Sequence, residues 1–235
     1  TVETGDAPAA GAPAPASEVH RADSWRCLQC DLAKPDPDWW LTSAGGRFAV
    51  VRTDAEPLPL DLALPGRVNA ANAALVVAAA TAMGVPAERA ARAVGSVTEV
   101  AGRYRQALVA GATLRMLLAK NPAGWQEAID MLGPAPRPVV AAINARIADG
   151  RDPSWLWDVP FERLQGRFVV ALGERRHDLA VRLRYAEVDH AVADSLAAGV
   201  RLARTRSDNT TEVDLIANYT AFQDYLVEVG PGRTA

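Results

Sequence analysis

The sequence is poor in lysine and carries no excess of positive charge. Only Lys34 and Lys120 of its 25 basic residues are lysines, and 28 acidic residues leave a net charge of −3. A chain without a positive field is poorly suited to hold a polyphosphate backbone or an anionic membrane surface. We therefore do not expect nucleic acid as a partner.

Long apolar runs and cysteines are also scarce. The stretch Ala70–Met83 is alanine-rich and shorter than the roughly 20 apolar residues that span a bilayer. Cys27 and Cys30 are the only cysteines, whereas a secreted disulfide scaffold normally carries more. The sequence also begins without the segments of a signal peptide. We expect a cytoplasmic protein without a transmembrane segment.

No glycine-rich nucleotide-binding loop is present. The sequence contains neither G-x-x-x-x-G-K-[ST] nor G-x-G-x-x-G, and Gly45-Gly46 fits a hairpin turn. Neither lysine lies in a glycine-rich loop, so the backbone nest that usually holds a triphosphate is missing. We expect the chain alone neither to bind nor to hydrolyse ATP, and any ATP site to be completed by residues outside it.

The remaining composition is that of a folded protein with a sizeable core. With 235 residues and 49% hydrophobic content, the chain is long enough for one large domain or two smaller ones. Residues 1–24 are rich in Ala, Pro, Gly and Ser, which predicts a flexible leader. We predict two further units, at residues 25–100 and 101–235.

Hydrophobic periodicity and turn residues predict the elements of each unit. The first should contain a knuckle at 25–41, strands at 47–53 and 58–64, and helices at 69–83 and 86–94. The second should contain strands at 104–109, 113–118, 139–143, 168–172 and 213–217, and helices at 124–132, 178–185, 191–203 and 219–229. This alternation is typical of an α/β fold with a parallel sheet.

Two asparagines stand at the start of the first predicted helix. Asn69 and Asn72, in LPGRVNAANAALVV, share one helix face near N–H groups that the helix leaves unpaired. Helix capping is the ordinary role of such residues. The segment also resembles the G-x-H-N-x-x-N-A motif of Mur ligases and folylpolyglutamate synthases, whose asparagines contact adenine; here Val68 replaces the usual aromatic residue or histidine.

Two later segments follow in the order that this family requires. AGRYR at 101–105 resembles the Gly-Arg that begins the Mur ligase C-terminal domain, where the arginine approaches nucleotide phosphate; Arg103 would have that role. LLAKNPAG at 117–124 stands where Mur ligases have D-Y-A-H-N-P. Leu117 replaces the acidic residue that would hold a ribose, and Lys120 replaces the histidine.

The Lys-Asn-Pro-Ala-Gly segment resembles one subfamily in particular, the MurT subunits of lipid II isoglutaminyl synthase. ADGRDPSWLWDVPFE at 148–162 and ANYTAFQDYL at 217–226 strengthen this resemblance, which runs from about residue 25 to residue 229. It implies the C-terminal end of a Mur ligase central domain with a zinc-ribbon-like knuckle, followed by a Rossmann-like Mur ligase C-terminal domain. The family's N-terminal ATP-binding region would be missing.

The resemblance implies an ATP-dependent carbon–nitrogen ligase of peptidoglycan biosynthesis. Its reaction would be amidation of the D-glutamate α-carboxylate of lipid II, with ATP, Mg²⁺ and ammonia taken from glutamine. Asn69 and Asn72 would lie at the adenine. Arg103, Lys120 and Asn121 would lie near the phosphates or an acyl phosphate.

Three aspartates in 148–162 are the candidate catalytic residues. Asp149, Asp152 and Asp158 follow a predicted strand, which places carboxylates at the sheet edge where open α/β folds bind ligands. The family's partner is a GatD-type, class-I-like glutamine amidotransferase, and the resemblance implies that one acid of this chain orients the partner's catalytic histidine. We rank Asp152 first. In the structural alternative, Asp152 or Ser154 caps a helix above packed tryptophans.

Cys27 and Cys30 correspond, by the resemblance, to the second half of a four-cysteine zinc ribbon. Tetrahedral zinc needs four ligands, and upstream only His20 offers a third. Bound Zn²⁺ and two reduced thiols without metal are therefore both open interpretations.

Two other functions also stay open. A stand-alone Mur- or folylpolyglutamate-type amino acid ligase would need the acidic residue that Leu117 replaces, and would leave the 148–162 segment unexplained. A non-catalytic docking module for a glutamine amidotransferase would fit the missing phosphate loop.

Overall fold

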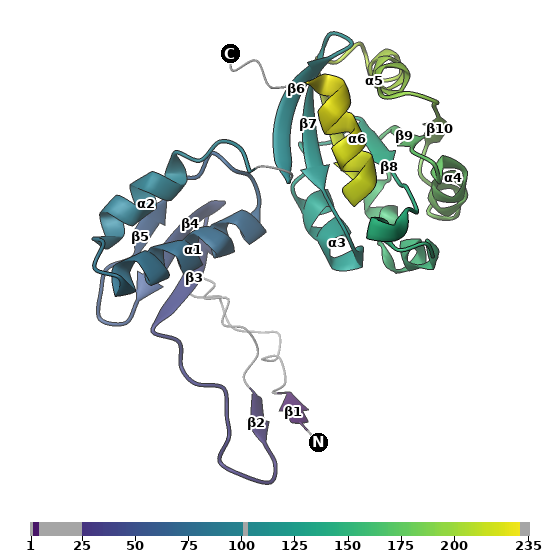
Figure 1. Cartoon of the computed structure of the whole chain (residues 1–235). Helices are drawn as coiled ribbons and strands as arrows, with labels where there is room; N and C mark the ends of the chain where they lie inside the picture. The colour runs from purple at the N-terminus through teal and green to yellow at the C-terminus, as the bar shows by residue number, and fades with distance from the viewer. Residues whose placement is uncertain (1, 5–24, 101–102, 231–235) are drawn as a thin grey trace. The chain divides into compact units, whose positions relative to one another are not determined.

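Two structural units make up this protein, residues 1–98 and 99–235 (Figure 1). The computed structural model describes residues 2–4, 25–100 and 103–230. Most of the predicted leader lies outside these residues; its described part, β1 (Val2–Thr4), pairs antiparallel with β2 (Trp25–Cys27). No helix within the described ranges has the length and apolar character needed to cross a membrane.

The first unit packs two helices against an antiparallel sheet. Its elements are β3 (Trp39–Ala44), β4 (Arg47–Arg52), β5 (Leu58–Leu60), α1 (Arg67–Ala82) and α2 (Ala87–Gly95). Gly45 and Gly46 take φ values of 57° and 76°, which suits the tight turn between β3 and β4. The predicted knuckle at 25–41 was wrong at its end, because its last residues begin β3, where Trp39 and Trp40 favour a strand.

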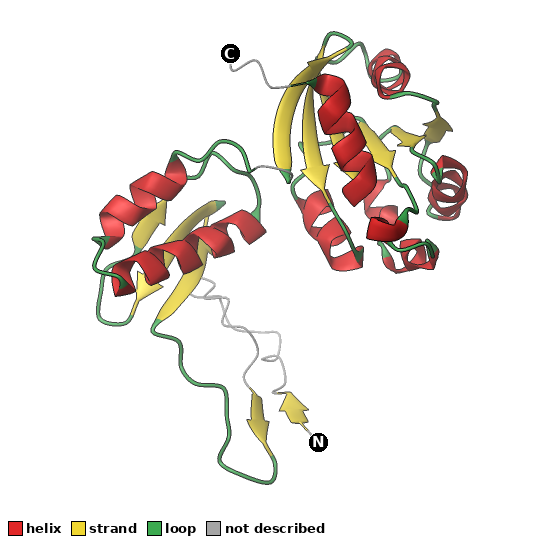
Figure 2. Ribbon diagram, in the orientation of Figure 1, coloured by secondary structure: helices red, strands yellow, loops and turns green. Residues whose placement is uncertain are grey.

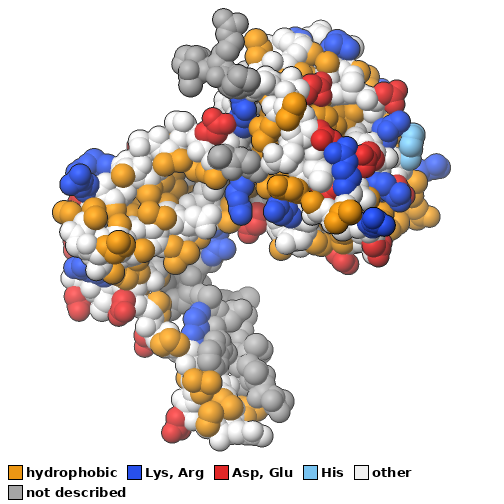
Figure 3. Space-filling model, viewed as in Figure 1, with side chains coloured by type: hydrophobic (Ala, Val, Ile, Leu, Met, Phe, Trp, Pro, Cys, Tyr) orange, Lys and Arg blue, Asp and Glu red, His pale blue; other side chains and the backbone are white. Residues whose placement is uncertain are grey.

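Helix α1 is apolar around most of its circumference. Its inner face places Ala73 and Val77 in the core of the unit, with Val50 and Leu60 of the sheet. Its outer face exposes hydrophobic side chains that gather over the helix in Figure 3, namely those of Leu75, Val76 and, at its end, Met83.

The second unit is built on a six-stranded sheet in the order β10-β9-β8-β11-β7-β6. Its strands are β6 (Tyr104–Val109), β7 (Ala112–Leu118), β8 (Val139–Ala142), β9 (Val169–Leu172), β10 (His190–Val192) and β11 (Glu212–Ala217). All neighbours run parallel except β6, which is antiparallel to β7. Strands β8 and β9 are buried along their whole length, as parallel strands covered on both faces should be.

Helices cover both faces of this sheet (Figure 2). They are α3 (Pro122–Asp130), α4 (Arg176–Tyr185), α5 (Leu196–Thr205) and α6 (Tyr219–Val229). Val200 of α5 and Phe222 of α6 share one hydrophobic cluster with alternate strand residues such as Val140 and Leu215. Because crossover connections are right-handed, α3 and α4 cover the opposite face.

One predicted helix in this unit began too early along the chain. A helix was expected at 191–203, but its first residues belong to the short edge strand β10. The helix begins only after Ser195, whose hydroxyl accepts a hydrogen bond from the Ala198 amide at 3.3 Å and so caps α5.

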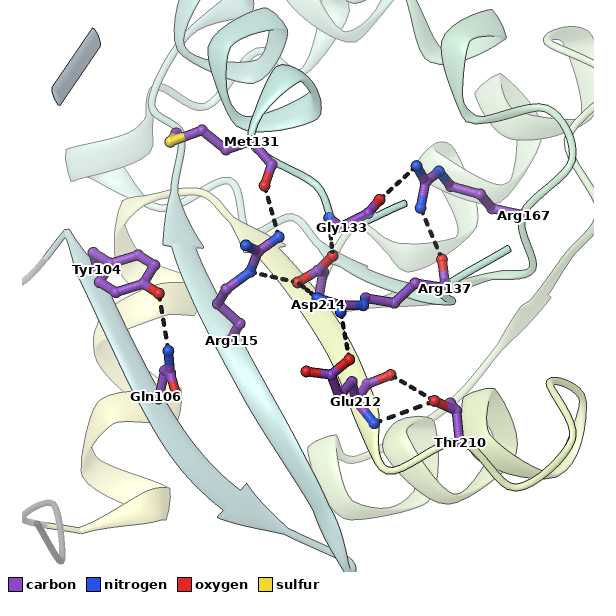
Figure 4. A network of polar contacts seen from close by, with 10 residues as sticks. All are labelled: Tyr104, Gln106, Arg115, Met131, Gly133, Arg137, Arg167, Thr210, Glu212 and Asp214. Carbon is purple, nitrogen blue, oxygen red and sulfur yellow. Dashed lines mark hydrogen bonds and ion pairs between the residues drawn. The ribbon is translucent and has the colours of Figure 1, made fainter. Parts of the chain in front are cut away.

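The strand β11 carries a buried carboxylate on the α3 side of the sheet, shown in Figure 4. Asp214 accepts hydrogen bonds from Arg115 Nε at 2.7 Å and from the Gly133 amide at 2.9 Å. Arg115 also donates to the Met131 carbonyl at 2.6 Å. This network fixes the chain after α3 to the centre of the sheet.

Candidate functional site

The strands β8 and β11 form the switch point of the sheet. After β8 the chain turns towards β9 through three 3-10 helices: η1 (Ile147–Asp149), η2 (Ser154–Asp158) and η3 (Phe161–Leu164). After β11 it enters α6, which packs on the other face. Open α/β sheets bind ligands at the carboxyl ends of strands whose connections diverge in this way. This edge is therefore the candidate site.

A buried pair of asparagines joins the two diverging connections. The backbone N–H of Asn144 donates to the side-chain Oδ1 of Asn218 at 3.0 Å, and the side-chain Nδ2 of Asn218 donates to the backbone carbonyl of Asn144 at 2.7 Å. Asn144 Oδ1 in turn accepts from the Glu174 amide at 2.9 Å, which ties the end of β9 to the pair. Asn144 is 4% exposed and Asn218 is 1% exposed, so their hydrogen bonds are shielded from water.

Arg146 spans this edge with both ends of its guanidinium. It donates to Glu174 Oε1 from Nε at 2.8 Å and to Asp224 Oδ1 from Nη1 at 3.0 Å. The hydrogen bond to Asp224 has the largest effect and the one to Glu174 the next largest, and both raise the pKa of Arg146 above its usual range. The cation holds the start of the η1 connection against the turn after β9 and against α6.

Asp149 fastens the same connection to α6. Its carboxylate accepts from the Thr220 amide at 2.9 Å, from the Thr220 hydroxyl, and from the Arg146 amide at 3.2 Å. Thr220 lies in the first turn of α6, where backbone N–H groups lack partners within the helix. Asp149 thus has the contacts of a capping residue, with both oxygens engaged inside its own chain.

The other two aspartates are differently placed. Asp152 is exposed and accepts from the Ser154 amide at 2.9 Å. Its hydrogen bonds with Ser154 hold the pKa of Asp152 below its usual value. Asp158 is also exposed and lines an open hollow of about 580 Å³ beside η2 and η3. The three carboxylates therefore do not form one cluster, because each has different neighbours.

Arg182 of α4 organises the wall of that hollow. This guanidinium is buried and donates to the carbonyls of Leu156 and Val159 at 3.3 and 2.8 Å, and it pairs with Glu162 at 2.9 Å. It also lies 5.4 Å from the Trp157 ring centroid. A buried cation with this many acceptors fixes the conformation of the segment that carries Asp158.

The two predicted tryptophans differ in their surroundings. Trp155 packs against Trp125 of α3 with ring centroids 6.4 Å apart. Trp157 is 55% exposed and makes an edge contact with Tyr185, which is itself 71% exposed. The alternative interpretation, in which the tryptophans pack beneath a capped helix, therefore fits Trp155 but not Trp157.

Lys120 and Asn121 lie at the carboxyl end of β7. Asn121 caps α3, because its Oδ1 accepts from the Gly124 amide at 2.8 Å. Lys120 is exposed, and its ammonium lies 4.5 Å from the centroid of the Tyr219 ring at the start of α6. The edge of the sheet thus presents a lysine and the first turns of two helices.

The remaining predicted ATP contacts are spread over both units. Asn69 Nδ2 donates to the Pro65 carbonyl at 2.6 Å, as a residue that holds the start of α1 would, and Asn72 is exposed on the same helix. Arg103 is exposed beside β6, and its carbonyl accepts from the Leu118 amide at 2.9 Å. No described glycine-rich loop adds a phosphate nest to these residues.

The cysteines form a turn without a complete metal site. Cys27 Sγ accepts from the Gln29 amide at 3.4 Å. This bond, together with contacts to Cys30, lowers the pKa of Cys27. Among the described residues no three His, Cys, Asp or Glu side chains are grouped to hold an ion, and His20 lies outside these residues. The described residues alone therefore do not fit tetrahedral zinc.

Sequence reasoning did not single out several residues of this edge: Asn144, Arg146, Arg182, Asn218, Tyr219 and Thr220. One signal was available, because two strands whose last residues are apolar are each followed by an asparagine, in AIN at 142–144 and IAN at 216–218. A buried polar residue after an apolar strand requires a partner, and each is the other's partner here.

Comparison with known proteins finds a family model that lies within the second unit and relatives that match a larger part of the chain. Residues 118–222 match the family model described as MurT ligase C-terminal. The MurT subunit of lipid II isoglutaminyl synthase (glutamine-hydrolyzing) from Streptococcus pneumoniae is 30% identical over 169 residues, 67% of this chain and 37% of that subunit. The Staphylococcus aureus subunit is 29% identical over 134 residues, 55% of this chain and 31% of that one. The chain spans about a third of the length of these curated relatives.

Solved structures share the fold at low sequence identity. A pseudomurein peptide ligase type C from Methanothermus fervidus aligns with a TM-score of 0.59 and 14% identity, over 87% of this chain and 44% of that one. UDP-N-acetylmuramate-alanine ligase MurC from Thermotoga maritima aligns with a TM-score of 0.55 and 17% identity, over 78% and 43%. These likenesses confirm the predicted α/β fold of the Mur ligase type, without showing a zinc ribbon.

Proposed function

Because this chain belongs to the MurT family, we propose that it acts in the synthetase subunit of a lipid II isoglutaminyl synthase. The reaction is amidation of the D-glutamate α-carboxylate of lipid II. The observation that carries the proposal is the carboxyl edge of the second unit, where Lys120 and the connection that bears Asp152 flank one switch point within the part that matches the family. The relatives support a ligase function of the Mur type.

The proposed chemistry proceeds in two steps. An oxygen of the substrate carboxylate attacks the γ-phosphorus of ATP, which gives an acyl phosphate and releases ADP. Ammonia then attacks the acyl carbon, phosphate leaves with the bonding electrons, and loss of a proton gives the amide. The Lys120 ammonium would stabilise the negative charge that the acyl phosphate carries, as a fixed cation does in phosphoryl transfer.

The chain would contribute one side of the ATP site. Asn69 and Asn72 would form the adenine edge, while Arg103, Lys120 and Asn121 would face the phosphates. Mg²⁺, when bound with ATP, would neutralise phosphate charge. The phosphate nest itself would come from residues that this chain does not contain, so we propose that the chain alone is inactive.

Ammonia would come from a glutamine amidotransferase of the GatD type bound to this chain as a heterodimer. We propose that Asp152 completes the partner's catalytic triad, because it is exposed, is held in its anionic form by Ser154, and makes fewer contacts than Asp149. Asp158 is the second candidate. Asp149 is third because its carboxylate already caps α6.

The test is to combine the complete synthetase subunit with the amidotransferase, lipid II, ATP, Mg²⁺ and glutamine. Mass spectrometry of the product should show the carboxylate converted to an amide, with phosphate released in equal amount. Product formation that continues when glutamine is replaced by an added amino acid, with that amino acid joined to lipid II, would instead indicate an amino acid ligase.

A further inference from the structure

Lys120 and Tyr219 occupy matching positions beyond two neighbouring parallel strands. Leu118 of β7 pairs with Ala217 of β11, and each of the two residues lies two positions further along its own chain. The pairing continues past the strands, because the Ala119 amide donates to the Ala217 carbonyl at 2.9 Å. The backbone thus brings this lysine and this tyrosine side by side at the carboxyl edge of the sheet.

Both residues rest on well-fixed backbone. Asn121, next to Lys120, caps α3 through the Gly124 amide, and the Phe222 amide donates to the Asn218 carbonyl at 2.8 Å in the first turn of α6. Asn218, next to Tyr219, is locked to Asn144. The points at which the two side chains leave the backbone are therefore both fixed.

At this edge the Lys120 ammonium makes a cation–π contact with the Tyr219 ring. The ammonium lies 4.5 Å from the ring centroid, well within the distance at which an aromatic face attracts a cation. Within residues 2–4, 25–100 and 103–230, no ion pair joins Lys120 to a carboxylate. A ring orients the cation without neutralising its charge, so the charge stays available for an anionic ligand.

We infer that Tyr219 is a positioning residue, which holds the Lys120 ammonium at the carboxyl edge so that it meets the anionic acyl phosphate. The inference rests on the proposed function, since it assumes that Lys120 serves the ligase step. It assigns a role to the aromatic face of Tyr219 and none to its hydroxyl. Phenylalanine should therefore replace it, whereas leucine should not.

The contact itself is testable by NMR on the chain as it stands. The sequence has only two lysines, so ¹³C-lysine labelling gives two sets of side-chain signals, and Lys34→Arg assigns them. The ring current should shift the Lys120 ε-methylene protons upfield. Tyr219→Phe should keep that shift and Tyr219→Leu should remove it, with unchanged circular dichroism. Spectra identical in all three proteins would overturn the inference.

The effect of this contact on activity is tested with the complete synthetase and its amidotransferase. Tyr219→Leu should lower kcat for amidation about two- to fivefold, the effect of one exposed cation–π contact, with little change in KM for ATP. Tyr219→Phe should restore the parent rate, and glutaminase activity should be the same in all variants. A Tyr219→Leu enzyme with the parent kcat would refute the positioning role.

Failure of the proposed function would appear differently, as a complete synthetase that forms no amide of lipid II with its amidotransferase. If amidation occurred and Lys120→Ala retained the parent rate, the proposed function would stand, but Lys120 would have no part in the ligase step and the role proposed for Tyr219 would be wrong too. If Lys120→Ala abolished amidation while Tyr219→Leu did not affect it, the proposed function would stand and the positioning role alone would be wrong.

Discussion

Asp149 and Thr220, 71 residues apart in sequence, are joined by two hydrogen bonds, from the amide and the hydroxyl of Thr220 to the Asp149 carboxylate. The first turn of α6 is thereby capped from another part of the chain. The same contact fixes the beginning of the connection that carries Asp152 and Asp158. A residue of the candidate site thus contributes to the stability of the fold.

We predict that Asp149→Asn lowers the free energy of unfolding by about 1 kcal/mol, the usual effect of losing a helix cap. Urea denaturation followed by circular dichroism measures this change. Asp152→Asn is the matched control, because Asp152 is exposed and its contact is confined to its own turn, so its loss should change stability less. Equal losses in the two variants would contradict the capping role of Asp149.

A larger loss of stability is expected at Asp214. Asp214→Asn leaves Arg115 without its buried anionic partner and weakens the bond to Gly133, so we predict a destabilisation of about 3 kcal/mol. The control is Asp189→Asn, which removes the exposed pair with Arg206 and should cost at most about 1 kcal/mol. Similar thermal unfolding of the two variants would show that the network in Figure 4 does not stabilise the sheet.

Tyr225 on α6 should make the fold sensitive to alkali. Burial, and then the nearby Glu228 and Asp224, raise the pKa of Tyr225 from 10.0 to about 12. The unfolded chain therefore loses this proton at a lower pH than the folded chain, so stability falls as pH rises between these two values. Tyr225→Phe should remove the part of this loss of stability that comes from Tyr225. The free energy of unfolding is measured against pH for both proteins, and tyrosinate absorbance checks the ionisation. Parallel pH profiles for the two proteins would contradict this prediction.

The cysteine turn should bind zinc weakly. Cys27 and Cys30 provide two ligands where a structural site needs four, so bound zinc should be removed readily by a chelator. Zinc content after dialysis against EDTA is the measurement. Retention of one zinc per chain would mean that other ligands complete the site.

The fold class was predictable because the longer strands and the longer helices have clear hydrophobic patterns. The predicted strand at 104–109 and the helix at 219–229 match the bounds of β6 and α6. Strand β10 has only three residues, and η1, η2 and η3 are too short to show a hydrophobic period. Those elements therefore gave no usable signal in the sequence.

The contacts of the site were less predictable than its location. The 148–162 segment follows β8, so its place at a sheet edge could be inferred. The partners Thr220, Asp224 and Tyr219 could not, because they depend on the insertion of β11 between β7 and β8. Strand order is a property of the whole sheet, and the local sequence does not encode it.

The most direct test of the account separates ammonia production from its use. Asp152→Asn and Lys120→Ala should each be placed in the complete synthetase, combined with the amidotransferase, and assayed for lipid II amidation with glutamine and, separately, with ammonium chloride. We predict that Asp152→Asn loses amidation with glutamine but keeps it with ammonium chloride, whereas Lys120→Ala loses both. Amidation at the parent rate with glutamine in both variants would contradict the account.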